Sequence, residues 1–200
     1  MRILVATMNA GKLREYERLL ADVPGLELAT MDTLCEKVDV VEDRDTFVGN
    51  ARKKATEIAA VAGVTCLADD SGLEVDALGG RPGVRSARYA GEGATDARNN
   101  EKLLEELRDV PEAERKARFR CAIAVVAADG RELAATDGAC DGQIGHEPRG
   151  THGFGYDPLF IPDGYTETMA ELDPETKNTI SHRAEAAAKL VPLLRELRTC

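Results

Sequence analysis

The sequence contains no tryptophan and only four phenylalanines and four tyrosines. A hydrophobic core must therefore be built mainly from Ala, Val, Leu and Ile. Cysteines are also few, and the spacing of the five present forms no CxxC pair: Cys35, Cys66, Cys121, Cys140 and Cys200. This spacing fits neither a zinc site nor a disulfide framework. We expect reduced, mostly buried thiols, which are typical of an intracellular protein.

Long apolar runs are missing too. A membrane-spanning helix needs roughly 20 predominantly apolar residues, and no run in this sequence approaches that length. The apolar stretch from Met1 to Ala6 is too short to be a signal peptide. The sequence therefore predicts a cytoplasmic protein that does not bind membranes.

Basic residues are fewer than acidic ones, 26 against 36, and the formal net charge is −10. A surface that binds nucleic acid concentrates positive charge against the phosphate backbone. Nucleic acid is therefore not an expected partner. A small anionic ligand is still compatible with this composition, since a few local lysines and a metal ion can outweigh the average field.

The 200 residues, 43% of them hydrophobic, suit a single domain over 1–200 or two tightly joined lobes without a separable linker. Asn9, Thr46 and Ser181 are the expected helix N-caps, and Pro192 should kink or break the last helix. Strands and helices alternate before a hairpin, so the sequence predicts an α/β fold with a mixed sheet. The expected strands are 2–7, 26–30, 64–68, 119–127 and 132–136, the expected helices are 12–20, 46–62, 95–107 and a last one from 181, and 138–155 should be irregular.

A first candidate site is the strand-to-helix turn from Thr7 to Lys12. Free backbone N–H groups at a helix N-terminus attract anions, and Gly11 permits close approach of a ligand. Lys12 adds a point charge for a phosphate. The segment is not a Walker A loop, because no GxxxxGK[ST] pattern occurs, and the chain has no GxGxxG either. These residues also describe an ordinary capped helix.

The segment Asp69-Asp70-Ser71-Gly72 ends an apolar strand and is expected to form a polar turn. Oxygen ligands without a His or Cys cluster suit Mg²⁺ or Mn²⁺. Adjacent strand side chains point in opposite directions, so we expect one aspartate, by preference Asp70, to face a ligand. The alternative is a turn whose aspartates accept hydrogen bonds from the backbone. The acidic loop 40–45 and the basic run Arg52-Lys53-Lys54 in the next helix add further charges. Solvated surface charge is the default interpretation of both, and at most one of the three basic side chains should point at a shared site.

Two later segments add aromatic and cationic side chains. Residues 150–158 combine three glycines with Phe154, Tyr156 and Asp157, and an aromatic face can stack on a nucleobase. Residues 177–183 place Lys177, His182 and Arg183 around an expected helix start. Positive charge opposes the dipole there, and a bound anion or carbonyl group would explain it. Packed aromatics and solvated surface charge are the alternatives.

These motifs, taken in order, resemble the inosine triphosphate pyrophosphatases, also called XTP/dITP diphosphatases, over nearly the whole chain. The resemblance covers Ala6-Thr7 with Asn9 and Lys12, Glu42 with Thr46-Phe47, Asn50-Ala51 with Lys54-Ala55, Ala68 to Leu73, Leu78-Gly79-Gly80, Pro82-Gly83, Ser86-Ala87-Arg88, Gly153 to Pro158, Lys177 and Ser181-His182-Arg183. Each motif alone is modest, but the ordered set is specific.

The resemblance implies an elongated α/β protein of two lobes around a long mixed sheet, with the substrate in the cleft between them, and a homodimer. It implies hydrolysis of ITP, dITP and XTP to the monophosphate and pyrophosphate with Mg²⁺, or Mn²⁺ as a substitute. Glu42 and Asp70 would bind the metal, Asp70 would also be the general base, and Ser71 would contact the substrate. The implied phosphate contacts are Thr7, Met8, Asn9, Ala10, Gly11, Lys12 and Lys54, and the implied base pocket is Phe154, Gly155, Tyr156, Asp157, Lys177, His182 and Arg183.

Three positions depart from the family pattern. Gly49 replaces a frequent carboxylate, so no third acidic ligand is expected there. His152 replaces a frequent glycine beside the base-binding loop, and Met8 is larger than the usual residue; both bear on substrate preference. Two alternative functions fit the same motifs: a pyrophosphatase for modified pyrimidines or general nucleotides, and a nucleotide-binding regulator without turnover.

Overall fold

The structure, a computed structural model, describes residues 1–33 and 38–197. The chain forms two compact units. Unit 1 comprises Met1–Asp70, Cys121–Gly138 and Arg183–Cys200, and unit 2 comprises Ser71–Arg120 and Ala139–His182. No helix in the described part of the chain is both long enough and apolar enough to cross a membrane.

Six strands form one mixed sheet in the order β2-β1-β3-β4-β5-β6. Strand β1 pairs in parallel with both β2 and β3, whereas β5 and β6 are antiparallel. The predicted α/β class with a mixed sheet is therefore confirmed. The strands are β1 (Arg2–Val5), β2 (Glu27–Thr30), β3 (Cys66–Val75), β4 (Lys116–Val126), β5 (Glu132–Ile144) and β6 (Phe160–Pro162).

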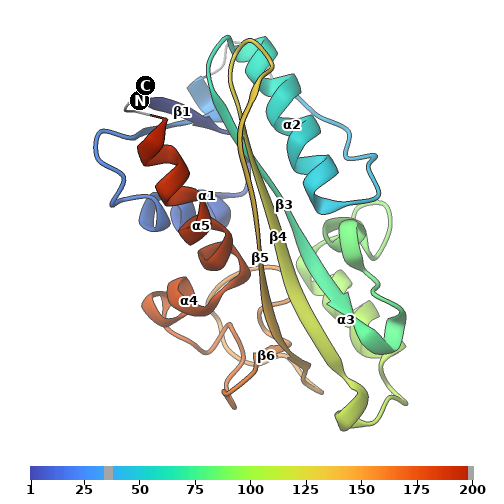
Figure 1. Ribbon diagram of the computed structural model, residues 1–200. Coiled ribbons are helices and arrows are strands. Elements are labelled where there is room, and N and C mark those ends of the chain that lie inside the picture. The colour runs from blue at the N-terminus through green and yellow to red at the C-terminus, as the bar shows by residue number, and fades with distance from the viewer. Residues whose placement is uncertain (34–37, 198–200) are drawn as a thin grey trace. The chain divides into compact units, whose positions relative to one another are not determined.

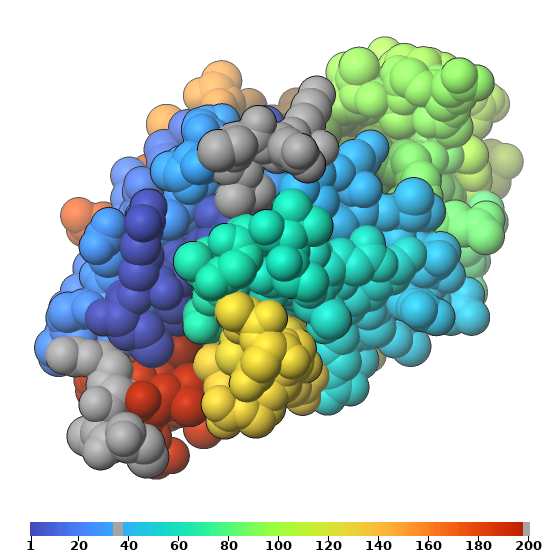
Figure 2. Space-filling view, turned by 90° about the horizontal axis from the view of Figure 1, so that it is seen from above, coloured from blue at the N-terminus to red at the C-terminus, as the bar shows by residue number. Residues whose placement is uncertain are grey.

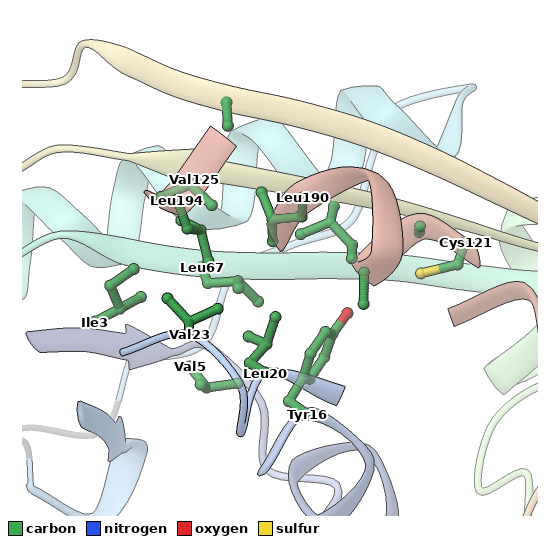
Figure 3. Close-up of a cluster of buried hydrophobic side chains, with 14 residues drawn as sticks. Ile3, Val5, Tyr16, Leu20, Val23, Leu67, Cys121, Val125, Leu190 and Leu194 are labelled. Carbon is green, nitrogen blue, oxygen red and sulfur yellow. The ribbon is translucent and has the colours of Figure 1, made fainter. Parts of the chain in front are cut away.

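Unit 1 contains α1 (Ala10–Leu19), α2 (Phe47–Ala62) and most of α5 (His182–Glu196), with the short 3₁₀ helix η1 (Met31–Thr33). Side chains alternate across its strands, so successive residues pack into two separate cores. One core joins α1 and α5 to one set of strand residues, as Figure 3 shows: Ile3, Val5, Leu67, Val125, Tyr16, Leu20, Leu190 and Leu194. The other core joins α2 to the intervening residues: Leu4, Ala68, Ala122, Ala124, Ala51, Ala55 and Ala59.

The predicted N-caps of α1 and α2 are confirmed, although α1 begins at Ala10, two residues before the predicted start. Asn9 caps α1 by accepting hydrogen bonds from the N–H groups of Gly11 and Lys12, and Thr46 caps α2 by accepting one from Gly49. Because α2 faces the strands with alanines, its backbone can lie close to the sheet. Figure 1 shows α2 on one side of the strands and α5 on the other. Figure 2 shows the hairpin turn between β4 and β5, in yellow, exposed at the surface.

Unit 2 packs α3 (Asp96–Glu106) and α4 (Pro174–Ile180) around a core of its own. Its largest buried polar side chain is Arg115, 1% exposed, which donates hydrogen bonds to the carbonyls of Leu107, Ile144 and Gly145. This arginine has a structural role. Its guanidinium donates the hydrogen bonds that these backbone carbonyls would otherwise accept from backbone N–H groups, at a place where three segments of the chain meet. The unit also has the 3₁₀ helices η2 (Asp76–Leu78), η3 (Gly83–Arg88) and η4 (Glu112–Glu114).

Several sequence-based boundaries are wrong. Strand β3 continues through Asp69-Asp70-Ser71-Gly72 to Val75, so this segment is a strand and not a turn. Strand β5 extends to Ile144, where an irregular segment was predicted. Helix α5 begins directly after Ser181, as expected, but it runs through Pro192 to Glu196 without ending there. Both α4 and β6 are too short, at seven and three residues, to leave a clear periodic pattern.

Candidate functional site

Strand β3 brings two adjacent carboxylates to opposite faces of the sheet in unit 1. Asp69 continues the row of Leu67, which packs toward α1 and α5, whereas Asp70 continues the row of Ala68, which packs toward α2. Both aspartates are buried, 2% and 5% exposed. The predicted divergence of the two side chains is confirmed, and it arises because β3 remains a strand at this point.

Asp69 is surrounded by cationic groups. One of its carboxylate oxygens, Oδ2, lies 2.9 Å from Lys12 Nζ and 3.1 Å from Arg183 Nη2. Arg183 also pairs with Glu15 of α1 and lies beside the ring of Tyr16. The resulting buried network joins the starts of α1 and α5 to the middle of β3. It ties the guanidinium of Arg183, expected in the base pocket, to carboxylates of unit 1.

Asp70 has a different environment. Its Oδ2 accepts a hydrogen bond of 2.8 Å from Nδ2 of Asn50, a fully buried residue of α2. On the same helix, Lys54 pairs with Glu42 and donates a hydrogen bond to the backbone carbonyl of Asp69. Asn50 also accepts from the backbone N–H of Arg44, which fixes its amide. Asp70 is thus held by a hydrogen bond from a neutral amide.

These environments move the two carboxyl pKa values in opposite directions. Burial alone raises both, because it disfavours the charged form. For Asp69 the charges of Lys12, Arg183 and Lys54 outweigh burial and hold its pKa well below the ordinary value of 3.8. For Asp70 burial dominates, the hydrogen bond from Asn50 opposes it and the charge of Glu42 adds to it, so its pKa rises to about 6. A carboxyl with a pKa near neutral can accept a proton in catalysis.

Glu42 and Asp70 are the carboxylates that could hold a metal ion. Among the described residues no group of three or more His, Cys, Asp or Glu side chains is arranged to hold one. Mg²⁺ is commonly bound through one or two carboxylates, with water and substrate phosphates completing its shell. Glu42 and Asp70, whose negative charges repel each other, therefore fit Mg²⁺ or Mn²⁺. They do not fit a closed structural metal site.

At Gly49, where the family resemblance implies a frequent carboxylate, a larger side chain would require its neighbours to shift. A Cβ atom there would lie 2.8 Å from Oγ1 of Thr46, the N-cap of α2, and 3.0 Å from Cβ of Arg44. The cap and the preceding loop close tightly around this glycine. The absence of an acidic ligand at Gly49 is therefore matched by the local geometry.

The turn before α1 gives a more restricted anion site than the sequence predicts. The N–H groups of Gly11 and Lys12 both donate to Asn9 Oδ1, at 2.8 and 3.1 Å. These two donors are engaged by the cap. Asn9 in turn donates its own N–H to Oγ1 of Thr7, at 3.1 Å. Met8 is 70% exposed, and Ala10 is the first residue of the helix.

In unit 2, Asp157 organises the candidate base-binding residues. Its Oδ2 accepts hydrogen bonds from Nζ of Lys177, at 2.7 Å, and from the backbone N–H of Phe154, at 2.9 Å. Lys177 Nζ also lies 5.0 Å from the centroid of the Phe154 ring. Gly153 has φ +82°, and a Cβ atom there would lie 2.1 Å from Asp157 Oδ2. Only glycine fits beside this carboxylate.

The remaining residues of this group are fixed by packing. The ring of His182 stacks on Phe119 with 4.8 Å between centroids and 17° between planes. The hydroxyl of Tyr156 donates a hydrogen bond of 2.8 Å to the carbonyl of Ser86, and burial raises the pKa of Tyr156. Lys177 lies in the last turn of α4 and not at a helix start, so its charge agrees with the dipole of that helix. Ser71 follows Asp70 within β3 and is half-buried.

Residues that the sequence analysis did not select hold the selected ones in place. Glu15 and Asn50 contact Arg183 and Asp70, and Asp69, considered but not chosen, is the most strongly charge-stabilised carboxylate. In unit 2, Asp96 and Asn100 of α3 contact the backbone of Gly155. Asn50 stands inside a motif quoted above, but a buried amide has no sequence pattern that distinguishes it from an exposed one.

Comparison with known proteins places this geometry in context. The model of the Ham1 family matches residues 3–193. A protein named dITP/XTP pyrophosphatase from Geobacillus kaustophilus is 53% identical over 188 residues, covering 94% of this chain and 91% of that protein. One of the same name from Anaeromyxobacter is 46% identical, covering 98% of both. The solved structure of a HAM1 protein from Coxiella burnetii is 41% identical, with a TM-score of 0.88 over 98% of this chain and 99% of that one.

Proposed function

The chain belongs to the Ham1 family, and from this we propose that it is a nucleoside triphosphate pyrophosphatase. Its substrates would be deaminated purine nucleotides, namely ITP, dITP and XTP, which it would remove from the nucleotide pool as monophosphate and pyrophosphate. The observation that carries this proposal is the pair of adjacent buried carboxylates on β3, one neutralised by cations and one with a raised pKa. Close relatives that are named dITP/XTP pyrophosphatases support the substrate class.

Unit 1 would bind the triphosphate. Lys12 and Lys54 supply positive charge, and each is now paired with a carboxylate, Asp69 and Glu42. A bound triphosphate would compete with Asp69 and Glu42 for these two lysines. The negative charge of the phosphates would then take the place of the negative charge of the carboxylates. Asp70 would take a proton from the water that attacks the α-phosphorus. Positioned charge of this kind is the main source of rate in phosphoryl transfer.

Glu42 and Asp70 are the residues we propose as ligands of Mg²⁺, for which Mn²⁺ could substitute. The bound ion would neutralise phosphate charge and lower the pKa of the attacking water. Asn50 would keep the Asp70 carboxylate in one orientation through its 2.8 Å hydrogen bond. Removal of the metal with EDTA should abolish turnover, and added Mg²⁺ should restore it; full activity in EDTA would contradict the assignment.

Unit 2 would bind the base. Phe154 offers a ring for stacking, while Lys177, held by Asp157, offers a donor to the keto oxygen at the purine 6-position. Adenine carries an amino group there, which cannot accept a hydrogen bond from Lys177, so one N–H of this buried charged group would lack its base acceptor while Asp157 keeps another. Such a donor costs about 1–3 kcal/mol or more, so ATP should be disfavoured. His182 is the second proposed donor. Arg183 already pairs with Asp69 and Glu15, so it would act on the base only if it made a further contact beyond these two.

The deciding experiment is a substrate panel with products separated. ITP, dITP and XTP should give the monophosphate and pyrophosphate, and ATP, dTTP and UTP should react far more slowly. Diphosphate and orthophosphate as products would overturn the proposed bond cleavage. Equal rates on pyrimidines would favour the general pyrophosphatase, and binding without product would favour a regulator. We also propose a cytoplasmic homodimer, from the family resemblance, to be checked by sedimentation.

A further inference from the structure

The loop that carries Phe154 is tied to α3 through the backbone of a single residue. Asp96 Oδ2 accepts a hydrogen bond of 2.7 Å from the N–H of Gly155, and Asn100 Nδ2 donates one of 3.0 Å to the carbonyl of the same residue. Asp96 and Asn100 lie four positions apart and so share one face of α3. One face of α3 therefore holds both the backbone N–H and the backbone carbonyl of Gly155.

The loop also borders an open space. A pocket of about 420 Å³ lies between α3 and the loop. It is lined by Asn100, Glu101, Leu104, His152, Phe154 and Pro158, among others. A backbone segment beside such a space can move into it at little cost in lost contacts. The two bonds to Gly155 therefore hold this side of the loop to α3, whereas Asp157 and Lys177 contact Phe154 itself.

The buried side chain of Asn100 is energetically unfavourable at its position unless it serves to hold Gly155. It is 7% exposed, and within the described part of the chain its side-chain oxygen has no hydrogen-bond partner. A buried acceptor without a partner is unfavourable, and an apolar side chain would avoid that cost. The bond from its Nδ2 to Gly155 gives a physical reason for an amide here.

We propose that Asp96, assisted by Asn100, is a positioning residue for base selection. By fixing Gly155, it holds the preceding Phe154 ring and the following Asp157, which orients Lys177, in the geometry that reads the purine 6-position. Asp96 does not touch the substrate. This inference rests on the proposed function, because it assigns base reading to the loop around Phe154.

The carboxylate of Asp96 suits this role better than a neutral group. A hydrogen bond from a backbone N–H to a charged acceptor is roughly twice as strong as one between neutral groups. Asp96 is also the first residue of α3, directly after the cap Thr95, where negative charge is stabilised by the helix dipole. The same charge thus stabilises the helix start and holds the loop.

The test compares Asp96→Ala with Glu101→Ala, a matched control on the same helix that removes an exposed acid lining the same pocket. Each purified variant is assayed with ITP and with ATP, and kcat and KM are determined separately. Asp96→Ala should lower the ITP-to-ATP ratio of kcat/KM at least tenfold, mainly by raising KM for ITP, with pyrophosphate still the product. Glu101→Ala should change the ratio less than twofold. Asp96→Asn, which keeps an acceptor, should fall between Asp96→Ala and the unaltered protein.

A second measurement covers the case in which Asp96→Ala folds poorly. Amide hydrogen exchange at Gly155 should be faster in Asp96→Asn than in the unaltered protein, while exchange in β3 and β4 stays the same. An unchanged ratio in Asp96→Ala, or an equal loss on ITP and ATP, would overturn the proposal. If the unaltered protein itself released no pyrophosphate from ITP, the proposed function would fail, which is a result distinct from loss of selectivity in one variant.

Discussion

Unit 1 arranges its candidate functional residues by charge, and unit 2 arranges them by backbone geometry. In unit 1 three cations, Lys12, Lys54 and Arg183, lie among buried or half-buried carboxylates. In unit 2 the buried pair of Lys177 with Asp157 lies beside a loop held through backbone atoms: the N–H groups of Phe154 and Gly155 donate to carboxylates, and the hydroxyl of Tyr156 donates to the carbonyl of Ser86.

This difference agrees with the proposed function, in which unit 1 binds the triphosphate and unit 2 binds the base. A triphosphate changes the charge of its surroundings when it arrives and again when pyrophosphate leaves. Cations that already have carboxylate partners can exchange them, so the site tolerates both states. A purine base is neutral and is distinguished by where its donors and acceptors lie, which requires fixed geometry. The predictions below test this contrast, from the largest expected effect to the smallest.

The largest effect is expected when the proposed proton acceptor of unit 1 is removed. Asp70→Asn should lower kcat on ITP by about 10²–10⁴-fold, the usual contribution of a general acid or base. Glu42→Gln should be comparably severe, because it removes the other proposed metal ligand. Steady-state assays at saturating Mg²⁺ measure both. Asp43→Asn, in the same loop but exposed and paired with Lys53, is the control and should be mild; an equal loss in Asp43→Asn would refute the assignment.

The second prediction concerns protein stability without metal. The folded-state pKa of Asp70, about 6, lies above the ordinary value of 3.8, so the folded protein binds more protons between these pH values than the unfolded chain does. Stability from this group is therefore present below about pH 4 and lost as pH rises through 6, by about 3 kcal/mol in all. Asp69, whose pKa is lowered, acts in the opposite sense, and its contribution is lost in acid.

Urea unfolding of EDTA-treated protein at pH 5 and pH 8 measures the Asp70 effect. Asp70→Asn should be more stable than the unaltered protein at pH 8 and should lose that advantage toward pH 4. Asp69→Asn should be less stable than the unaltered protein at pH 8, because Lys12 and Arg183 would lose their shared partner. If both variants shifted stability in the same direction at pH 8, the contrast between the two carboxylates would be wrong.

The third prediction separates the two units by selectivity. Lys177→Ala should lower kcat/KM for ITP by roughly 10–100-fold more than for ATP, since a lost hydrogen bond to a charged donor costs about 1.5–3 kcal/mol. Lys12→Ala should slow every triphosphate alike and keep the ratio. Measured kcat/KM values for ITP, XTP and ATP give both patterns. A uniform loss in Lys177→Ala would show that Lys177 does not read the base.

The sequence gives a good account of unit 1 and a weaker one of unit 2, for a physical reason. Local signals such as the caps Asn9 and Thr46 and the alternation along β3 depend on neighbours in the chain, so they are legible in the sequence. The β3 boundary was still wrong, because burial among lysines and Asn50 lets two aspartates stay in a strand.

The contacts of unit 2 join segments far apart in the chain, so no local pattern announces them. Asp96 reaches Gly155 across 59 positions and Tyr156 reaches Ser86 across 70. The residue types at the site were predicted through family resemblance, but their partners were not. Arg183 shows the same limit, since its position beside Lys177 and His182 in the sequence gave no indication of its pairs with Glu15 and Asp69.

The smallest expected effect compares two glycines of the loop in unit 2. Gly153 and Gly155 both have positive φ, 82° and 63°, so alanine at either should cost about 1–2 kcal/mol of stability from backbone strain. At Gly155 nothing lies within 4 Å of an added Cβ, whereas at Gly153 it would meet Asp157 Oδ2 at 2.1 Å. Gly155→Ala should therefore show only the strain, as a lower midpoint of urea unfolding, with selectivity nearly kept. Gly153→Ala should also displace the carboxylate that holds Lys177, and so lower the ITP-to-ATP ratio of kcat/KM. If the two variants lost selectivity equally, the geometry of Asp157 would not be what fixes the base reader, and the distinction between a charge-held unit 1 and a geometry-held unit 2 would lose its support.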